Sequence, residues 1–162
     1  MLQYLILTTF FSFLFIAQLW PAAQALARWM GKNAELVLEW AQSKGGGVLE
    51  VGAGSGLPGL AAAKLLVEAR KERQEKARDV EEDEEGALSP VRVVLSDSSS
   101  AVLELLQHNI QSNFPTSQEI LSETDLMKIN LSCRTLSWSR ENAKKLADEL
   151  GKFSLVLGSD IM

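Results

Sequence analysis

The fold of this chain is decided by the stretch VLEVGAGSGLPG, residues 48–59. A short apolar run leads into glycines at positions 52, 54 and 56, and the apolar, alanine-rich residues 60–67 follow. This order predicts a β-strand, a tight loop and an α-helix. Alternating glycines permit positive φ and let a ligand approach the backbone without meeting a Cβ atom. Unpaired N–H groups at the start of the helix can bind a polar or anionic group. The stretch therefore predicts a nucleotide-binding loop.

Two classes of nucleotide are compatible with this loop. Gly54, Gly56 and Gly59 satisfy the G-x-G-x-x-G pattern of dinucleotide-binding proteins. Glu50 lies two residues before the first glycine, however, and a carboxylate there would face the pyrophosphate of NAD unfavourably. S-adenosylmethionine carries an ammonium group and a sulfonium centre, so an acid in this position favours that molecule. We expect an S-adenosylmethionine site, with a dinucleotide site or a glycine-rich turn without a ligand as the alternatives.

Composition limits the remaining possibilities. The chain has 162 residues, enough for one domain with a single core, and its formal net charge of −5 argues against general nucleic-acid binding. Cys133 is the only cysteine, so no intramolecular disulfide can form and a reducing compartment is expected. His108 is the only histidine and has no cysteine near it, so we expect no metal site.

The first 18 residues are mostly apolar and carry no charged side chain. This length just reaches that of a membrane span, but a secretory signal would need a basic start that this stretch lacks. A buried element of a soluble domain and a segment foreign to the fold are the other interpretations. Membrane association through residues 1–18 stays open and is not favoured.

Two helices are expected before the glycine loop, over residues 21–31 and 34–42, with Trp29 and Trp40 in the core. After the loop helix, residues 68–85 are mostly charged. Their first part is expected to extend the helix into solvent through i,i+4 pairs. Residues 70–88 are expected to form an exposed loop inserted outside the core.

Strands and helices alternate through the rest of the chain. Strands are expected at residues 91–95, 132–138 and 153–157, and helices at 100–113 and 139–150, with a short helix near 119–127. Such alternation predicts an open, mostly parallel sheet with helices on both faces. Asp97 follows the second strand, where an acid can bind ribose hydroxyls or cap the next helix.

Five segments together resemble one known family. They are LWPAAQALARWM (19–30), VLEVGAGSGLPGLAAAKL (48–65), VVLSD (93–97), LSW (136–138) and FSLVLGSDIM (153–162). With these segments, residues 19–162 resemble the seven-β-strand protein-lysine methyltransferases of the methyltransferase-like 21 type, also grouped as methyltransferase family 16. The resemblance implies a Rossmann-like class I methyltransferase fold. It also implies methyl transfer from S-adenosylmethionine to a lysine of a protein substrate, in the cytoplasm or the nucleus.

The resemblance also assigns roles to individual residues. Asp160 matches the acid that opens the family's Asp/Glu-x-x-Tyr motif, where lysine and cofactor meet, and is the expected catalytic residue. Asp97 would bind the ribose, and Trp138 would lie near the adenine. The full set of expected cofactor-binding residues is Trp20, Glu50, Gly52, Gly54, Gly56, Asp97, Trp138 and Ser159.

Two departures from the family pattern limit these expectations. The tyrosine of the motif would be residue 163, whereas the sequence stops at Met162, so the C-terminal strands of the family are expected to be missing and activity to be weak. LSW also replaces the commoner Leu-Asp-Trp, which removes one acid near the adenine. A methyltransferase-like binding protein without activity and a small-molecule methyltransferase are therefore the alternative functions.

Overall fold

The computed structural model describes residues 19–43, 46–80, 90–114 and 129–161. In this part of the chain, four parallel strands form one sheet with the order β3-β2-β1-β4. The strands are β1 (Gly47–Val51), β2 (Val91–Asp97), β3 (Ile129–Thr135) and β4 (Leu155–Gly158). The α/β class and the Rossmann-like arrangement expected from the sequence are confirmed.

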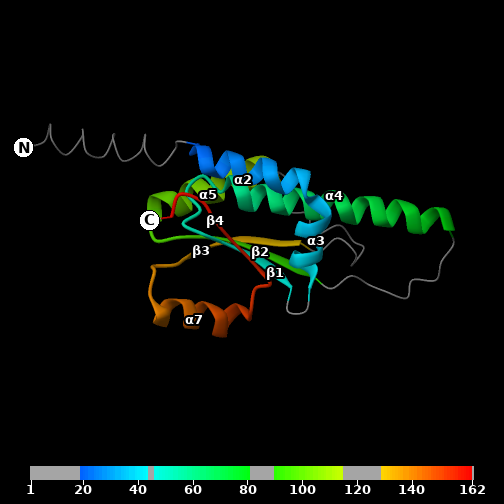
Figure 1. Cartoon of the computed structure of the whole chain (residues 1–162). Helices are drawn as coiled ribbons and strands as arrows, with labels where there is room; N and C mark the ends of the chain where they lie inside the picture. Colours follow the sequence, from blue (N-terminus) through cyan, green and yellow to red (C-terminus); the bar gives the residue numbers. More distant parts are fainter. Residues whose placement is uncertain (1–18, 44–45, 81–89, 115–128, 162) are drawn as a thin grey trace, which may run out of the picture.

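Helices cover both faces of the sheet (Figure 1). The helices α4 and α5 pack against one face, and α2 and α3 pack against α4 on the same side. The helix α7 covers the other face. Their bounds are α2 (Pro21–Lys32), α3 (Ala34–Gln42), α4 (Leu57–Val80), α5 (Ser100–Asn113) and α7 (Arg140–Leu150).

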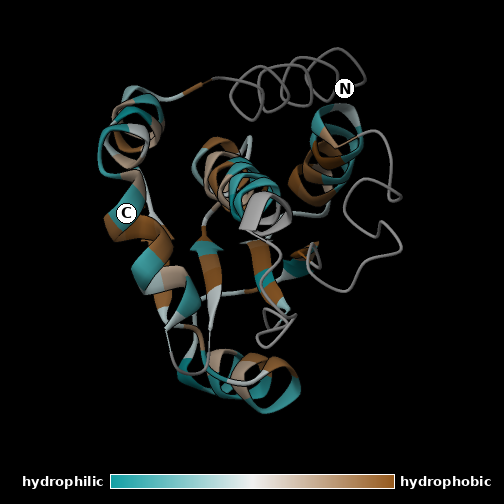
Figure 2. Cartoon of the chain, turned by 90° about the vertical axis from the view of Figure 1, so that its right-hand side faces the viewer, coloured by the Kyte–Doolittle hydropathy of each residue, from teal (hydrophilic) through white to brown (hydrophobic). Residues whose placement is uncertain are grey.

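The core forms because strands β1 and β2 alternate apolar side chains between the two faces. Val48 and Leu95 pack in the cluster that also contains Leu66 of α4, whereas Leu49 lies in a second cluster with Leu146 of α7. Figure 2 shows these strands as hydrophobic ribbons between the helices above and α7 below. Strands buried on both faces are typical of parallel sheets, and here they carry the loop that forms the site.

The third strand lies earlier in the chain than the expected range 132–138. It begins at Ile129 and ends at Thr135, in register with β2, whose last residue Asp97 pairs with Thr135. Pairing stops where β2 stops. Leu136 then turns to the opposite face and packs with α7, so the segment LSW follows the strand instead of ending it.

The expected exposed loop at residues 70–88 is wrong for its first part. Residues 70–80 continue α4, and Arg70 is 3% exposed. Neither glycine nor proline interrupts this part of the sequence, and oppositely charged side chains at i,i+4 spacing favour a helix. Residues 81–88 lie outside the described part of the chain, as do the apolar segment 1–18 and the short helix expected near 119–127.

Trp29 and Trp40 do not lie in the core, contrary to expectation. They are 43% and 40% exposed and stack on each other with ring centroids 6.4 Å apart. The buried positions of α2 and α3 are instead taken by Met30, Val37 and Ala41. Each tryptophan directly precedes a buried residue in its helix, so it lies at the margin of the buried face.

Candidate functional site

A cavity of about 380 Å³ lies at the carboxyl ends of β1 and β4. In the sheet order, β2 and β3 extend to one side of β1, while β4 pairs on its other side. In open α/β sheets, ligands bind in the crevice at such a point of reversal, and the volume falls in the range of small-molecule sites. The cavity is lined by Trp20, Ala23, Gly52, Ala53, Gly54, Ser55, Ser159 and Asp160.

The glycine loop between β1 and α4 forms one wall of this cavity. Gly54 has φ +53°, and a Cβ atom added there would meet no atom within 4 Å, because the position opens into the cavity. Gly56 has a different role. A Cβ atom at that position would come within 2.6 Å of the side chains of Leu95 and Leu106, so this glycine lets the loop pack against the core.

Glu50 lies beneath the loop and does not line the cavity. Its side chain is 1% exposed, and its Oε2 accepts a hydrogen bond of 2.9 Å from the backbone N–H of Gly59. A Cβ atom on Gly59 would lie 2.6 Å from this oxygen, so glycine is needed for the approach. Burial, and to a lesser degree the charge of Asp97, raises the pKa of Glu50 to about 8, although the Gly59 hydrogen bond opposes the shift. Through this hydrogen bond, Glu50 links the first turn of α4 to the end of β1.

Asp97 holds the same loop from the end of β2. Its Oδ2 accepts a hydrogen bond from the N–H of Gly54 at 3.3 Å, and its Oδ1 accepts one from the N–H of Ser99 at 3.0 Å. Ser99 is the N-cap residue of α5, so Asp97 stabilises the loop and the start of that helix together. Its binding to a ribose remains a prediction. Asn109 of α5 also stabilises the loop, because its side-chain amide donates a hydrogen bond of 2.9 Å to the carbonyl of Ser55.

Ser159 and Asp160, which come directly after β4, form another part of the cavity lining. Asp160 has φ +52°, and no other non-glycine residue in the described ranges has positive φ. Aspartate tolerates this conformation better than most residues. The side chain is exposed and stands on the same cavity as Trp20, which comes from the start of α2. An acid, an aromatic ring and an open glycine loop thus meet at one point.

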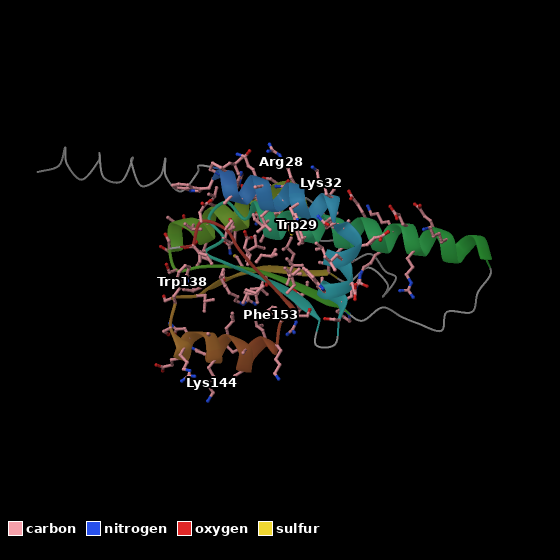
Figure 3. All side chains as sticks on the ribbon, in the orientation of Figure 1. Arg28, Trp29, Lys32, Trp138, Lys144 and Phe153 are labelled. Carbon is pink, nitrogen blue, oxygen red and sulfur yellow. The ribbon has the colours of Figure 1, made fainter. Side chains whose placement is uncertain are left out.

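Trp138 lies beside the loop but does not line the cavity. It is 57% exposed, and its Cζ2 lies 3.4 Å from the position of a Cβ on Gly52. Ile161 contacts the same position, at 2.8 Å. Figure 3 shows Trp138 at the end of the sheet where α7 begins. The ring is therefore within reach of a ligand that extends along the loop past Gly52.

The structure thus brings Trp20, Gly52, Gly54, Ser159 and Asp160 together around the cavity. It places Glu50 and Gly56 beneath the loop, and Asp97 behind it.

The sequence analysis missed three lining residues, Ala23, Ala53 and Ser55. Two of them lie between the predicted glycines, and Ala23 lies one helical turn after Trp20, so loop membership and helical spacing were the available signals.

A doubly covered parallel sheet with a glycine loop defines a Rossmann-like protein, and the cavity at the point of reversal is its candidate ligand site. A family model described as lysine methyltransferase, Methyltransf_16, matches residues 15–162. The chain belongs to this lysine methyltransferase family and is a methyltransferase. Membership in a methyltransferase family argues against the dinucleotide enzymes that the loop left open. A comparison with curated proteins found no match.

Two further observations concern the described residues alone. The described residues contain no group of three or more histidine, cysteine, aspartate or glutamate side chains placed to hold a metal ion. None of the helices among them has the length and apolar character of a membrane span.

Proposed function

We propose that this chain transfers a methyl group from S-adenosylmethionine to the ε-amine of a lysine in a protein substrate. One observation carries the proposal: the cavity joins the open glycine loop at Gly54 to the exposed carboxylate of Asp160, with Trp20 beside both. The first feature suits a cofactor that lies against the backbone, and the second suits an amine that must be oriented.

The residues present fit this cofactor better than a pyrophosphate. The N–H groups of Gly54 and Gly59 already donate to Asp97 and Glu50, so the loop has fewer free donors for phosphate oxygens. Asp160 adds a carboxylate to the lining of the cavity. A carboxylate near a cavity stabilises a cationic ligand and destabilises an anionic one. Gly52, Gly54 and Ser55 would hold the cofactor from one side, and Trp20, Ser159 and Asp160 from the other.

When bound, the cofactor supplies an electrophilic methyl group on a sulfonium. The task of the protein is to present an uncharged amine in line with that group. Asp160 would accept a hydrogen bond from the amine and so direct its lone pair into the cavity. The apolar surfaces of Trp20 and Ala23 would exclude water and thereby favour the uncharged amine.

The surroundings of the cavity support a protein substrate. Leu19, Trp20 and Ile161 are 50%, 37% and 45% exposed; Trp20 lines the cavity, and the other two are the chain neighbours of the lining residues Trp20 and Asp160. Exposed apolar groups around a site are typical of surfaces that contact another macromolecule. A protein substrate in the cytoplasm or the nucleus is consistent with the single, free Cys133.

Calorimetry with S-adenosylhomocysteine tests the cofactor assignment, with NAD as the comparison ligand. We expect binding of the first and none of the second. The variant Gly54→Val should lose the binding, because its side chain would fill the space at the loop. Equal affinity of the variant and the wild type would refute the assignment of the loop.

A radiolabelled transfer assay on cell lysate tests the reaction itself, with label expected on lysine side chains. Asp160→Asn keeps the shape of the side chain but removes its charge, so it should lower transfer at least about tenfold while S-adenosylhomocysteine binding persists. Binding without any transfer by the wild type would instead support a methyltransferase-like binding protein. Label on small molecules alone would support the small-molecule alternative.

A further inference from the structure

A stacked pair of tryptophans, Trp29 and Trp40, lies outside the cavity. The two rings come from α2 and α3, lie 25° from parallel and are about two-fifths exposed each. Tryptophan is usually well buried, and exposed tryptophans are enriched at the centres of protein interfaces. Because the rings stack, they form one continuous apolar surface where the two helices meet. We call this surface, together with the exposed charged residues of α2 and α3, the tryptophan surface.

Charge is divided between the two helices that carry this surface. The charged residues of α2 are Arg28 and Lys32, both basic, and those of α3 are Glu35 and Glu39, both acidic. All four side chains are exposed. Each pair has i,i+4 spacing and therefore forms one row along its helix. Figure 3 shows Arg28 and Lys32 extending from the outer side of α2. Of the two helices that carry the tryptophan surface, α2 therefore has exposed charges that are all basic and α3 has exposed charges that are all acidic.

We propose that a second copy of this chain occupies the tryptophan surface and forms a two-fold symmetric dimer. In such an interface each patch faces its own copy, so residue i contacts residue j and j contacts i. A two-fold axis near the tryptophan pair places α2 of one copy against α3 of the other. Arg28 and Lys32 then face Glu35 and Glu39 of the second copy, twice over, around four stacked or adjoining indole rings.

Self-complementarity distinguishes a second copy from an unrelated partner. A surface that selects an acidic partner needs one sign of charge, and so does a surface that selects a basic partner. This one carries two charges of each sign, sorted by helix. A partner with the same division, rotated by two-fold symmetry, pairs every charge, and another copy of the chain has that division. Complementary rim charges of this kind determine orientation and partner choice.

The dimer would leave the cavity open. Trp20 and Ala23 line the cavity at the start of α2, whereas Trp29 lies nine residues after Trp20 on that helix. At 1.5 Å per residue the separation is about 13 Å along the axis. Dimerisation is therefore separable from cofactor binding, and variants of the tryptophan surface should bind S-adenosylhomocysteine like the wild type.

Charge reversal tests the proposal, with sedimentation velocity as the measurement. We expect the wild type to form a reversible dimer. The double variants Arg28→Glu/Lys32→Glu and Glu35→Lys/Glu39→Lys should each weaken self-association at least about tenfold, because like charges then meet twice. An equimolar mixture of the two should form a heterodimer, since every charge finds an opposite partner. The chain with all four reversals should dimerise again.

Two controls keep the result specific. Lys144→Glu changes a charge on α7, on the other face of the sheet, and should leave the dimer unchanged (Figure 3). Val156→Lys places a charge on the exposed face of β4 and removes association through that strand, so it should also leave the dimer intact. Circular dichroism should show that all variants are folded.

A monomeric wild type at all concentrations would overturn the proposal, and would mean that something other than a second copy covers the tryptophan surface. A dimer that persists unchanged in both double variants would overturn it as well, because another face would then be the interface. Failure of the mixture to form a heterodimer would also refute the two-fold arrangement.

Discussion

Replacing Glu50 with glutamine should change the pH dependence of stability in a defined direction. The pKa of Glu50 is raised from 4.5 to about 8 in the folded chain, first because burial disfavours the charged carboxylate. The folded state therefore holds a proton that the unfolded state releases above pH 4.5. The stability associated with this proton is complete below pH 4.5 and is lost as the pH rises to about 8. The slope is at most about 1.4 kcal/mol per pH unit, or about 5 kcal/mol over the whole window.

The variant Glu50→Gln removes this titration and keeps the shape of the side chain. Its amide oxygen can still accept the hydrogen bond from the Gly59 N–H, which Oε2 accepts in the wild type. We expect the two proteins to have similar free energies of unfolding near pH 4.5. With rising pH the variant should become the more stable one, even though an acid of the site has been removed.

Urea unfolding, followed by tryptophan fluorescence between pH 4.5 and 8.5, gives the difference between the two proteins. Subtraction cancels every other titrating group that both proteins share. A difference that does not depend on pH would refute the buried, protonated Glu50. A variant that loses stability as the pH rises would contradict the sign of the argument.

Three further predictions concern the loop and the edge of the sheet. Gly56→Ala should lower the free energy of unfolding, measured with urea, by more than Gly54→Ala does. Both positions have positive φ, so backbone strain should cost each variant about 1–3 kcal/mol, but only the Gly56 variant also adds a Cβ against Leu95 and Leu106. Asp97→Asn should lower the pKa of Glu50, because the charge of Asp97 contributes to raising that pKa. The loss of stability with rising pH should therefore occur at lower pH than in the wild type. Val156→Lys should slow aggregation measured by light scattering, because β4 pairs only with β1 in the described sheet and Val156 is 59% exposed on it.

The sequence predicted the fold well where a local pattern has one structural outcome. An apolar run followed by alternating glycines folds as strand, loop and helix in nearly any context. Strand β1 lies within a residue of the quoted run, and α4 begins at Leu57, three residues before the alanine-rich segment. The third strand was misplaced because its range depends on pairing with β2, which local periodicity does not contain. The sequence left the end of α4 open, because a mixed run of charges is compatible with either a longer helix or a solvated loop.

The sequence also could not predict which side chains at the edge of a helix's apolar face are buried. A buried helix face is predicted by the spacing of Leu36, Val37 and Trp40. The spacing does not say which residues at the edges of that face are covered by neighbouring elements. The structure buries Val37 and Ala41 and leaves Trp40 two-fifths exposed. A large ring at the margin has room only if no neighbouring element covers it, and that depends on tertiary packing.

In the candidate site, the residues that line the cavity were easier to predict than the roles of the acids beneath it. Trp20, Gly54 and Asp160 lie where matched segments meet at the carboxyl end of the sheet. An acid at the end of a strand can face either a ligand or the protein's own backbone, and sequence does not distinguish these outcomes. Glu50 and Asp97 both bind backbone N–H groups of the loop or of the helices that follow.

This use of the two acids bears on ligand choice. A helix N-terminus after a glycine loop ordinarily attracts anions, because its N–H groups are free. Here the N–H of Gly59 donates to Glu50 and the N–H of Gly54 donates to Asp97, so two of these backbone donors are already occupied by hydrogen bonds within the protein. The same bonds hold the loop in its positive-φ conformation before any ligand arrives, which lowers the entropy lost on binding. Glu50, with a pKa of about 8, is mostly uncharged at neutral pH. Among the residues that line the cavity, Asp160 is the ionisable one. A preorganised loop with few free donors, facing one exposed carboxylate, favours a ligand that is cationic at its reacting end.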